Sequence, residues 1–313
     1  MEVSTVKSLF TSKDGKTSIR VLSWEPKGEV RAILQISHGM IEHIERFDRF
    51  ATAMAEQGIL TAGNDHLGHG WSVTDPEHRG YFGEPDGNLN LLSDMRTLQK
   101  QLQEEHPGVP YFIMGHSMGS FLVRQYMAIY GNGISGAIIM GTGYTDSAKL
   151  LFGQAACTAA SLLHGEMYRS ETINNMAVGS YERPDDPDYP PGAWLTRDRE
   201  VVKQFHEDKL CQFIFTVNGY KNMLRGIQKA QSSSLMKQIP KDLPVLIVSG
   251  AEDPVGDFGK GPKKLEEVYK SLGMTDVTCK LYPEDRHEIL NEPDKETVDS
   301  DILEWMNARM QKK

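Results

Sequence analysis

A serine stands between two glycines in the segment 115–119, which reads Gly-His-Ser-Met-Gly. The short apolar run 111–114 precedes this segment, and apolar residues recur at helical spacing from 118 to 130. Where a strand turns sharply into a helix, a serine in the turn can present its hydroxyl at the edge of a sheet, and its neighbours must be very small. This context predicts that Ser117 is a catalytic nucleophile and not an ordinary turn residue.

A serine hydroxyl needs a general base, and His287 is the best candidate among the ten histidines of the chain. It lies in the loop after the last predicted strand, 277–282, at the carboxyl end of the sheet where Ser117 also emerges. His287 must be neutral to accept a proton, so kcat/KM is expected to rise from acid pH and then level off.

The base in turn needs a carboxylate that holds its tautomer and stabilises the imidazolium. Asp253 follows the apolar strand 245–248, which places it at the same end of the sheet. The chain order Ser117, Asp253, His287 is the one expected for an α/β-hydrolase. Three other carboxylates remain open for this role: Glu252, Asp257 and, more distantly, Asp146.

An acyl-transfer reaction also needs two N–H donors for the oxyanion of its tetrahedral intermediate. The backbone N–H of Met118, directly after the nucleophile, is one candidate, and that of Met40, in the loop after the strand 31–36, is the other. Met40 could instead only line the pocket. We expect three further residues to line the site: His38, Gly39 and His116. Of these, His116 is expected to be a packing residue more than a second base.

Two histidine pairs could suggest a metal, namely His38 with His43 and His66 with His69. No third ligand falls at a zinc-type spacing, and a serine mechanism needs no metal, so we predict neither a metal nor another cofactor. His38 is expected to order the oxyanion loop, and Asp65, His66 and His69 to brace the loop beside the nucleophile.

Eight predicted strands alternate with helices, which indicates an α/β fold: a mostly parallel eight-stranded sheet with helices on both faces. The strands are expected at 3–11, 17–24, 31–36, 59–62, 111–114, 134–140, 244–250 and 277–282. The helices between and after them are expected at about 46–57, 89–105, 118–130, 263–272 and 294–310.

The stretch 145–236 interrupts this alternation because it shows no buried strand. It contains helical regions at 150–163 and 198–224 and many large apolar residues. We expect a helical lid inserted into an α/β core formed by 1–144 and 237–313. Its apolar residues either pack the lid onto the sheet or line an acyl tunnel and touch a lipid surface.

The composition excludes several classes of protein. A formal net charge of −9 argues against a nucleic-acid-binding protein. The three cysteines form no Cys-x-x-Cys pair and are expected to be free thiols in a reducing compartment. Neither a signal-peptide pattern nor an apolar run of about 20 residues is visible, so we expect a cytoplasmic protein, with its oligomeric state open.

The motifs together resemble the monoacylglycerol lipase and lysophospholipase group of the α/β-hydrolases, of the serine aminopeptidase S33 type. They are His38-Gly39, Asp-His-Leu-Gly-His-Gly-x-Ser at 65–72, Gly-His-Ser-Met-Gly at 115–119, Asp253 and His287. The resemblance covers about 20–145 and 240–310. It implies cofactor-free hydrolysis of esters with one long acyl chain through an acyl-enzyme, with Ser117, Asp253 and His287 as catalytic residues and Met40 and Met118 as oxyanion donors. Ser120 departs from the group, which often has a second glycine there.

The expected function is therefore a serine ester hydrolase acting on a small-molecule ester with an acyl chain, such as a monoacylglycerol or a lysophospholipid. A transient contact of the lid with a membrane surface stays open. The alternatives are an esterase, thioesterase, small-peptide amidase or acyltransferase on small soluble substrates. A non-catalytic member that binds a ligand in the same cleft is the most distant alternative.

Overall fold

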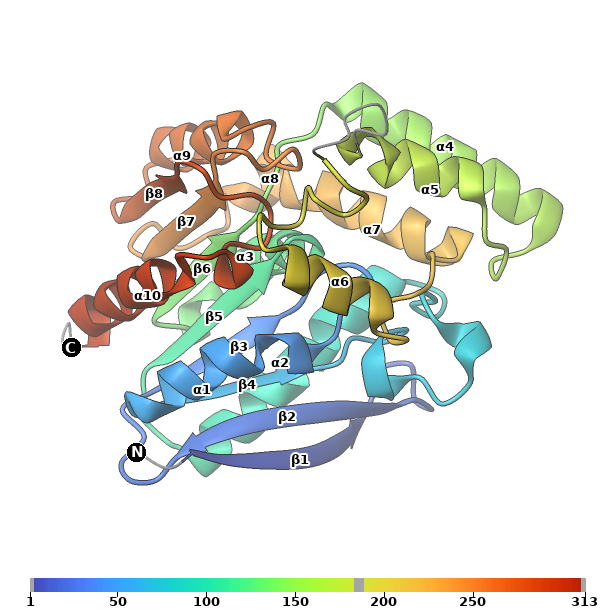
Figure 1. Ribbon diagram of the computed structural model, residues 1–313. Helices are drawn as coiled ribbons and strands as arrows, with labels where there is room; N and C mark the ends of the chain where they lie inside the picture. The colour runs from blue at the N-terminus through green and yellow to red at the C-terminus, as the bar shows by residue number, and fades with distance from the viewer. Residues whose placement is uncertain (1–2, 183–188, 311–313) are drawn as a thin grey trace.

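The computed structural model describes residues 3–182 and 189–310 and is built around one eight-stranded sheet (Figure 1). The strand order is β1-β2-β4-β3-β5-β6-β7-β8, in which β1 and β2 pair antiparallel, as do β2 and β4, and every other pair is parallel. This confirms the predicted mostly parallel α/β fold. The strands are β1 (Val3–Thr11), β2 (Ser18–Pro26), β3 (Ala32–Ser37), β4 (Ile59–Asn64), β5 (Tyr111–His116), β6 (Gly136–Met140), β7 (Val245–Gly250) and β8 (Val277–Tyr282).

The central strands read as continuous apolar runs because both faces of the sheet are covered. Along β5, Ile113 belongs to one hydrophobic cluster, while Phe112 and Met114 belong to the other. This alternation is the two-residue period of a strand. The cluster around Phe112 includes residues of α1 and α10, and the cluster around Ile113 includes residues of α2, α3 and α9, so helices cover both faces.

Ten α-helices occur in the described residues, and several boundaries differ from the prediction. The helix expected at 46–57 is a 3₁₀ turn, η1 (Ile44–Phe47), followed by α1. The helices are α1 (Asp48–Glu56), α2 (Gly87–Glu105), α3 (Met118–Tyr130), α4 (Ser147–His164), α5 (Glu171–Val178), α6 (Arg199–Glu207), α7 (Val217–Ala230), α8 (Ser233–Met236), α9 (Lys260–Ser271) and α10 (Lys295–Met310). None of the helices in the described part of the chain is long and apolar enough to cross a membrane.

The helical region expected at 198–224 consists of two helices, α6 and α7, separated by a turn at 208–211 and a short segment without helix. The side chain of Thr216 caps α7 by accepting from the N–H of Gly219, which starts a new helix there. Between the helices, Phe213 and Phe215 pack around the ring of His69. These contacts with the core explain why the helix is interrupted between α6 and α7, and they cannot be predicted from helical periodicity alone.

Helices α4 to α8 form an insertion between β6 and β7, and its described part contains no strand. Helix α7 packs against α2 and α3 of the core, and α4 packs on α7 (Figure 1). Figure 1 shows α4 and α5 at the upper right, beyond α7, and α6 lower down. The insertion therefore adds a helical layer to the core at the side of α3, the helix that follows Ser117.

Candidate active site

Ser117 occupies the turn between β5, which ends at His116, and α3, which starts at Met118. Its backbone angles are φ 51° and ψ −118°, a conformation that non-glycine residues rarely adopt. A Cβ at Gly119 would collide with the carbonyl oxygen of Ser37 on β3, so this position must be glycine. The sequence therefore produces a strained turn that exposes the serine at the carboxyl end of the sheet.

His287 and Asp253 are both buried, and His287 Nδ1 lies 3.0 Å from Asp253 Oδ2. The other carboxylate oxygen of Asp253 accepts from the N–H of Val255 at 2.9 Å. Because the carboxylate is anchored in this way, it can hold His287 in the tautomer with the proton on Nδ1, leaving Nε2 free to accept a proton.

The His287 ring lies near the strand end that carries Ser117. A Cβ on Gly141 would lie 3.2 Å from His287 Cε1, and the preceding residue, Met140, accepts the backbone N–H of Ser117 at 3.0 Å. No hydrogen bond joins the Ser117 hydroxyl to His287 within the described residues. Such catalytic bonds are often long in the absence of substrate and tighten when it binds.

The three rival carboxylates face elsewhere. Glu252 is exposed, and Asp257 is exposed and pairs with Lys260 at 3.3 Å. Asp146 caps the N-terminus of α4 through the N–H of Ala148. Of these four carboxylates, the structure brings Asp253 into contact with the histidine.

The loop after β3 passes directly beside Ser117, since a Cβ on Gly39 would lie 3.0 Å from Ser117 Cβ. The N–H of Met40 has no hydrogen-bond partner among the described residues. Met118 is the first residue of α3, where a helix leaves its N–H groups without a carbonyl. Both backbone groups are thus available to an oxyanion, although the donor roles remain a prediction.

His38, predicted to line the site, is fully buried behind this loop. Its Nδ1 donates to the carbonyl of Gly39 at 2.8 Å, and its Nε2 accepts from the N–H of His66 at 2.9 Å. Burial lowers the pKa of His38, and it lowers that of His66 to about 3, so both rings are neutral. Asp65 accepts from the N–H of Ile44 at 2.9 Å. These bonds tie the loops after β3 and β4 together.

Sequence reasoning missed Glu42, which is buried beneath the site. Its Oε1 accepts from the N–H of Gly39 and from His116 Nδ1, the latter at 2.9 Å, and its Oε2 accepts from Arg46 at 3.2 Å. A single glutamate in a polar stretch carries no periodic signal, so only its contacts reveal it. His116, predicted as a packing residue, has polar partners at both ring nitrogens.

The contact of Trp194 with His287 was also missed, because Trp194 was expected only as one of the large apolar residues of the insertion that either pack on the sheet or line a tunnel. The carbonyl of Trp194 accepts the N–H of His287 at 3.3 Å, and the Trp194 ring lies over the His287 ring with 5.2 Å between the centroids. The next residue, Leu195, accepts the N–H of Glu288 at 2.7 Å. The insertion therefore contacts the histidine directly.

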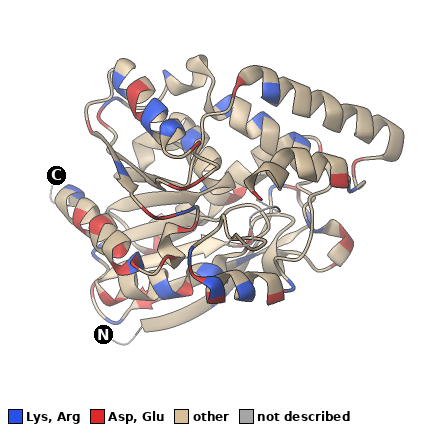
Figure 2. Cartoon of the chain, turned by 45° about the horizontal axis from the view of Figure 1, so that its top comes forward, with Lys and Arg blue, Asp and Glu red and all other residues tan. Residues whose placement is uncertain are grey.

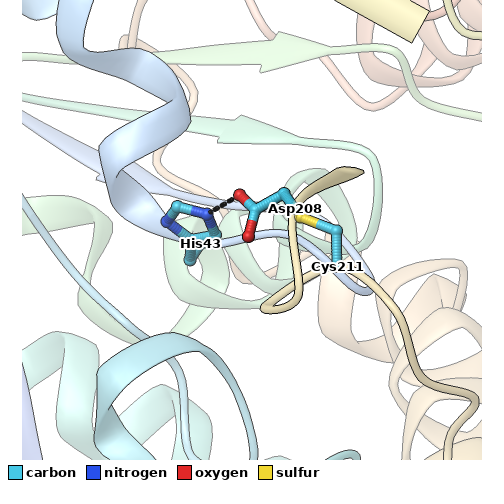
Figure 3. Close-up of side chains that lie close together, drawn as sticks. All are labelled: His43, Asp208 and Cys211. Atoms are coloured by element: carbon cyan, nitrogen blue, oxygen red, sulfur yellow. Dashed lines mark hydrogen bonds and ion pairs between the residues drawn. The ribbon is translucent and has the colours of Figure 1, made fainter. Parts of the chain in front are cut away.

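His43, Asp208 and Cys211 lie close together where the loop after β3 meets the insertion (Figure 3). Their potential metal-ligating atoms all lie within 4.8 Å of one another. However, His43 Nε2 already bonds Asp208 Oδ2 at 2.7 Å, and burial raises the pKa of the Cys211 thiol, which a metal would need as a thiolate. We therefore interpret this cluster as a hydrogen-bonded link between core and insertion.

A mostly apolar pocket lies between α2, α3 and α7 and reaches Met118, the residue after the nucleophile. Its lining combines apolar side chains with three amides: Phe82, Leu91, Met118, Phe121, Leu122 and Met223, and Asn88, Gln125 and Asn222. Two of the amides are paired, because Asn88 Nδ2 donates to Gln125 Oε1 at 2.9 Å.

A protein-family model described as serine aminopeptidase, S33, matches residues 28–294. Among curated proteins, the chain is 25% identical to a monoacylglycerol lipase of Mycolicibacterium smegmatis over 287 residues, 92% of each chain. It is 26% identical to a monoglyceride lipase of Mus musculus over 305 residues, which cover 92% of this chain and 86% of the relative. Among solved structures, a carboxyl esterase from Bacillus coagulans in complex with glycerol superimposes with a TM-score of 0.87 and 26% identity, covering 98% of this chain and 99% of that one.

Proposed function

Because this chain belongs to the serine aminopeptidase S33 family of α/β-hydrolases, we propose that it hydrolyses single-chain lipid esters through an acyl-enzyme on Ser117. It is a serine hydrolase of the monoglyceride lipase type. The single observation that carries the mechanism is the buried bond between His287 Nδ1 and Asp253 Oδ2, beside the strained turn of Ser117.

The proposed reaction has two steps. Ser117 Oγ attacks the ester carbonyl while His287 Nε2 takes its proton, and Asp253 stabilises the imidazolium. The N–H groups of Met40 and Met118 bind the oxyanion, and His287 then protonates the leaving alcohol. Water repeats the sequence on the acyl-enzyme and releases the fatty acid. No step requires a cofactor.

Two observations support an acyl chain in the substrate. The relatives from Mycolicibacterium smegmatis and Mus musculus are named monoacylglycerol and monoglyceride lipase. The pocket between α2, α3 and α7 reaches Met118 and is lined by apolar side chains such as Leu122 and Met223, which is the chemistry that a hydrocarbon chain requires, but its free space is small and must widen to admit one.

We also propose that the stretch 145–236, of which 183–188 lie outside the described residues, is a lid on the core 1–144 and 237–313. The contact of Trp194 with His287 supports this division.

Helix α4 supports a transient contact of the lid with a lipid surface. Phe152, Leu162 and Leu163 are 67%, 83% and 77% exposed. Lys149 is the one Lys, Arg, Asp or Glu of the helix, which is almost entirely tan in Figure 2.

The decisive experiment is a rate profile over p-nitrophenyl esters from acetyl to palmitoyl, together with monoacylglycerols, with Ser117→Ala as the blank. A maximum at octanoyl or longer chains, with glycerol release, is the expected result. A maximum at acetyl or butyryl without glycerol release would move the protein to the small-ester class. Full activity of Ser117→Ala would refute the mechanism.

Further substrates distinguish the hydrolysis of a lipid ester from related reactions. Aminoacyl anilides test the amidase activity that the family description favours, acyl thioesters test a thioesterase, and an added alcohol acceptor tests acyl transfer. A fluorophosphonate probe is expected to label Ser117. Folded protein that stays unlabelled would instead favour a non-catalytic, ligand-binding member.

A further inference from the structure

Glu42 and His116 are two buried ionisable side chains that the proposed reaction does not use. Glu42 is 3% and His116 is 4% exposed. His116 Nδ1 lies 2.9 Å from Glu42 Oε1, and His116 Nε2 lies 3.2 Å from the backbone carbonyl oxygen of His287. The histidine next to the nucleophile therefore bonds, through its two nitrogens, the loop after β3 and the loop after β8.

Both partners of His116 are acceptors. A backbone carbonyl has no proton to donate. The carboxylate of Glu42 already accepts from the N–H of Gly39 and from the guanidinium of Arg46, and both bonds favour its ionised form. A neutral imidazole carries one N–H and could bond only one of its two partners, whereas an imidazolium donates from both nitrogens. The geometry thus fits His116 in its charged form.

The electrostatics of the pair agree with this geometry. Burial opposes a charge on His116, but the Glu42 carboxylate outweighs it and raises the pKa of His116 above its ordinary value. Burial likewise opposes a charge on Glu42, yet His116 and then Arg46 hold the pKa of that carboxyl well below its usual range. Each member of the pair is therefore held in its ionised form by the other.

We propose that His116 is an imidazolium at neutral pH and acts as a positioning residue, which joins the loop of His287 to the loop of Gly39 through Glu42. This inference rests on the proposed role of His287 as the general base. The ring centroids of His116 and His287 are 4.8 Å apart, so the charge of His116 lies next to the proposed base. His116 thereby holds the loop of the proposed base in place and puts a positive charge beside it.

Other charged or titratable groups face the two rings, and the inference must hold in their presence. They are Asp253 from the loop after β7, Glu42 and Arg46 from the loop and turn after β3, and Glu288 from the loop after β8, while Tyr181 from the turn Gly179–Tyr181 lies near Asp253. Arg46 and Glu288 neutralise each other through two bonds of 2.7 and 2.8 Å. A substitution of His116 leaves all five side chains in place, and Arg46 remains as the cation that bonds Glu42.

The charge of His116 can be measured on the wild-type protein without any activity. In a ¹⁵N spectrum of histidine-labelled protein at neutral pH, His116, assigned through its absence in His116→Gln, is expected to carry protons on both ring nitrogens. Glu42→Gln, which removes the anion, is expected to return the ring to one proton. A single ring proton on His116 in the wild type would overturn the proposal.

The effect on the base is measured from the pH profile of kcat/KM. In His116→Gln the midpoint of the acid limb is expected to move to higher pH, because a buried positive charge whose ring lies 4.8 Å from the ring of the proposed base is lost. The matched control is His69→Gln, since burial lowers the pKa of His69 and this variant removes a buried imidazole that carries no charge. Its midpoint is expected to stay in place.

The outcomes separate the inference from the proposed function. A midpoint that does not move in folded His116→Gln, with a normal thermal transition, would overturn the role of His116 and leave the mechanism standing. A wild type without an acid limb, or with activity that survives Ser117→Ala, would remove the mechanism, while the ¹⁵N spectrum would still test the charge of His116.

Discussion

At the residue scale, the turn at Ser117 is held by more than its glycines. A backbone conformation of this kind costs on the order of 1–3 kcal/mol and persists only where its surroundings enforce it. The hydroxyl of Ser120 donates to the carbonyl of Ser117 at 2.6 Å and lies 2.9 Å from Thr142 Oγ1. Ser120, which directly follows Gly119, therefore adds a bond that stabilises the turn.

The choice of Asp253 as the carboxylate can be tested by removing one charge. Asp253→Asn is expected to lower kcat by about three to four orders of magnitude, because an amide in this place favours the wrong tautomer of His287. The measurement is kcat on a soluble ester. Asp257→Asn, the matched control on an exposed rival, is expected to leave kcat unchanged. Equal losses in the two variants would contradict the assignment.

At the element scale, the loop after β3 is the structural centre of the site, because three other loops are bonded to it. Gly39 contacts the nucleophile turn, Ile44 bonds Asp65 after β4, and His43 bonds Asp208 of the insertion. Movement of the insertion would therefore be transmitted to the proposed oxyanion donor at Met40.

The bond between His43 and Asp208 gives a prediction for the stability of this junction. Asp208→Asn is expected to lower the free energy of unfolding at neutral pH by about 1–2 kcal/mol, because His43 loses a charged partner. Urea denaturation measures this loss. Asp198→Asn in the same insertion is the control: Asp198 caps α6 by accepting from the N–H of Glu200, and asparagine caps a helix about as well. A control as unstable as Asp208→Asn would refute the special role of the bond.

The pKa of the Asp208 carboxyl determines how the stability contributed by this bond changes with pH. Although burial acts to raise it, the hydrogen bond from His43 contributes to lowering the pKa of Asp208 below its ordinary value. A lowered carboxyl pKa contributes stability that is present above the unfolded value and is lost as the pH falls through the folded one. The difference between wild type and Asp208→Asn should therefore shrink at acid pH.

Helix α4 carries the proposed contact with lipid, and this contact can be removed without touching the site. Leu162→Glu combined with Leu163→Glu is expected to abolish sedimentation with phospholipid vesicles and to spare kcat on a soluble short-chain ester. Leu9→Glu is the matched control, because Leu9 is 67% exposed on the edge strand β1. Unchanged vesicle binding of the double variant would count against α4 as the contact surface.

At the scale of the whole molecule, the antiparallel hairpin of β1 and β2 is joined to the parallel part of the sheet through a buried charge. Asp94 on α2 accepts from Ser12 Oγ and from the N–H of Lys13, both at 2.7 Å. Burial raises the pKa of Asp94 to about 6, while these two bonds act in the opposite direction. The connection therefore stabilises the fold less well when the carboxyl is ionised.

This predicts a measurable pH dependence of stability. A carboxyl whose pKa is raised in the folded state contributes stability that is present below its unfolded value and is lost as the pH rises through the folded one. From about pH 4 to about pH 7, the wild type is expected to lose up to about 3 kcal/mol relative to Asp94→Asn. Urea denaturation of both proteins across this pH range measures the two free energies of unfolding. A difference between them that does not change with pH would refute the prediction.

Much of the fold could be predicted from the sequence because its signals are local. The continuous apolar runs of the central strands and the helical spacing from 118 to 130 repeat within a few residues. The alternation of strands and helices then restricts the topology to a mostly parallel sheet. The same regularity located Ser117, Asp253 and His287, since each follows the carboxyl end of a parallel strand and these ends meet at one edge.

What the sequence by itself determined is thus the sheet, the strained turn and the chain positions from which the proposed catalytic side chains emerge. Only the tertiary structure decided which partners hold them, as in the pairs Glu42–His116 and His43–Asp208, which join residues 74 and 165 positions apart. The physical reason is that strand and helix patterns repeat along the chain, whereas a hydrogen bond between distant loops depends on where two side chains point after folding. The charge state of His116 follows from such contacts, and for that reason it cannot be read from the sequence.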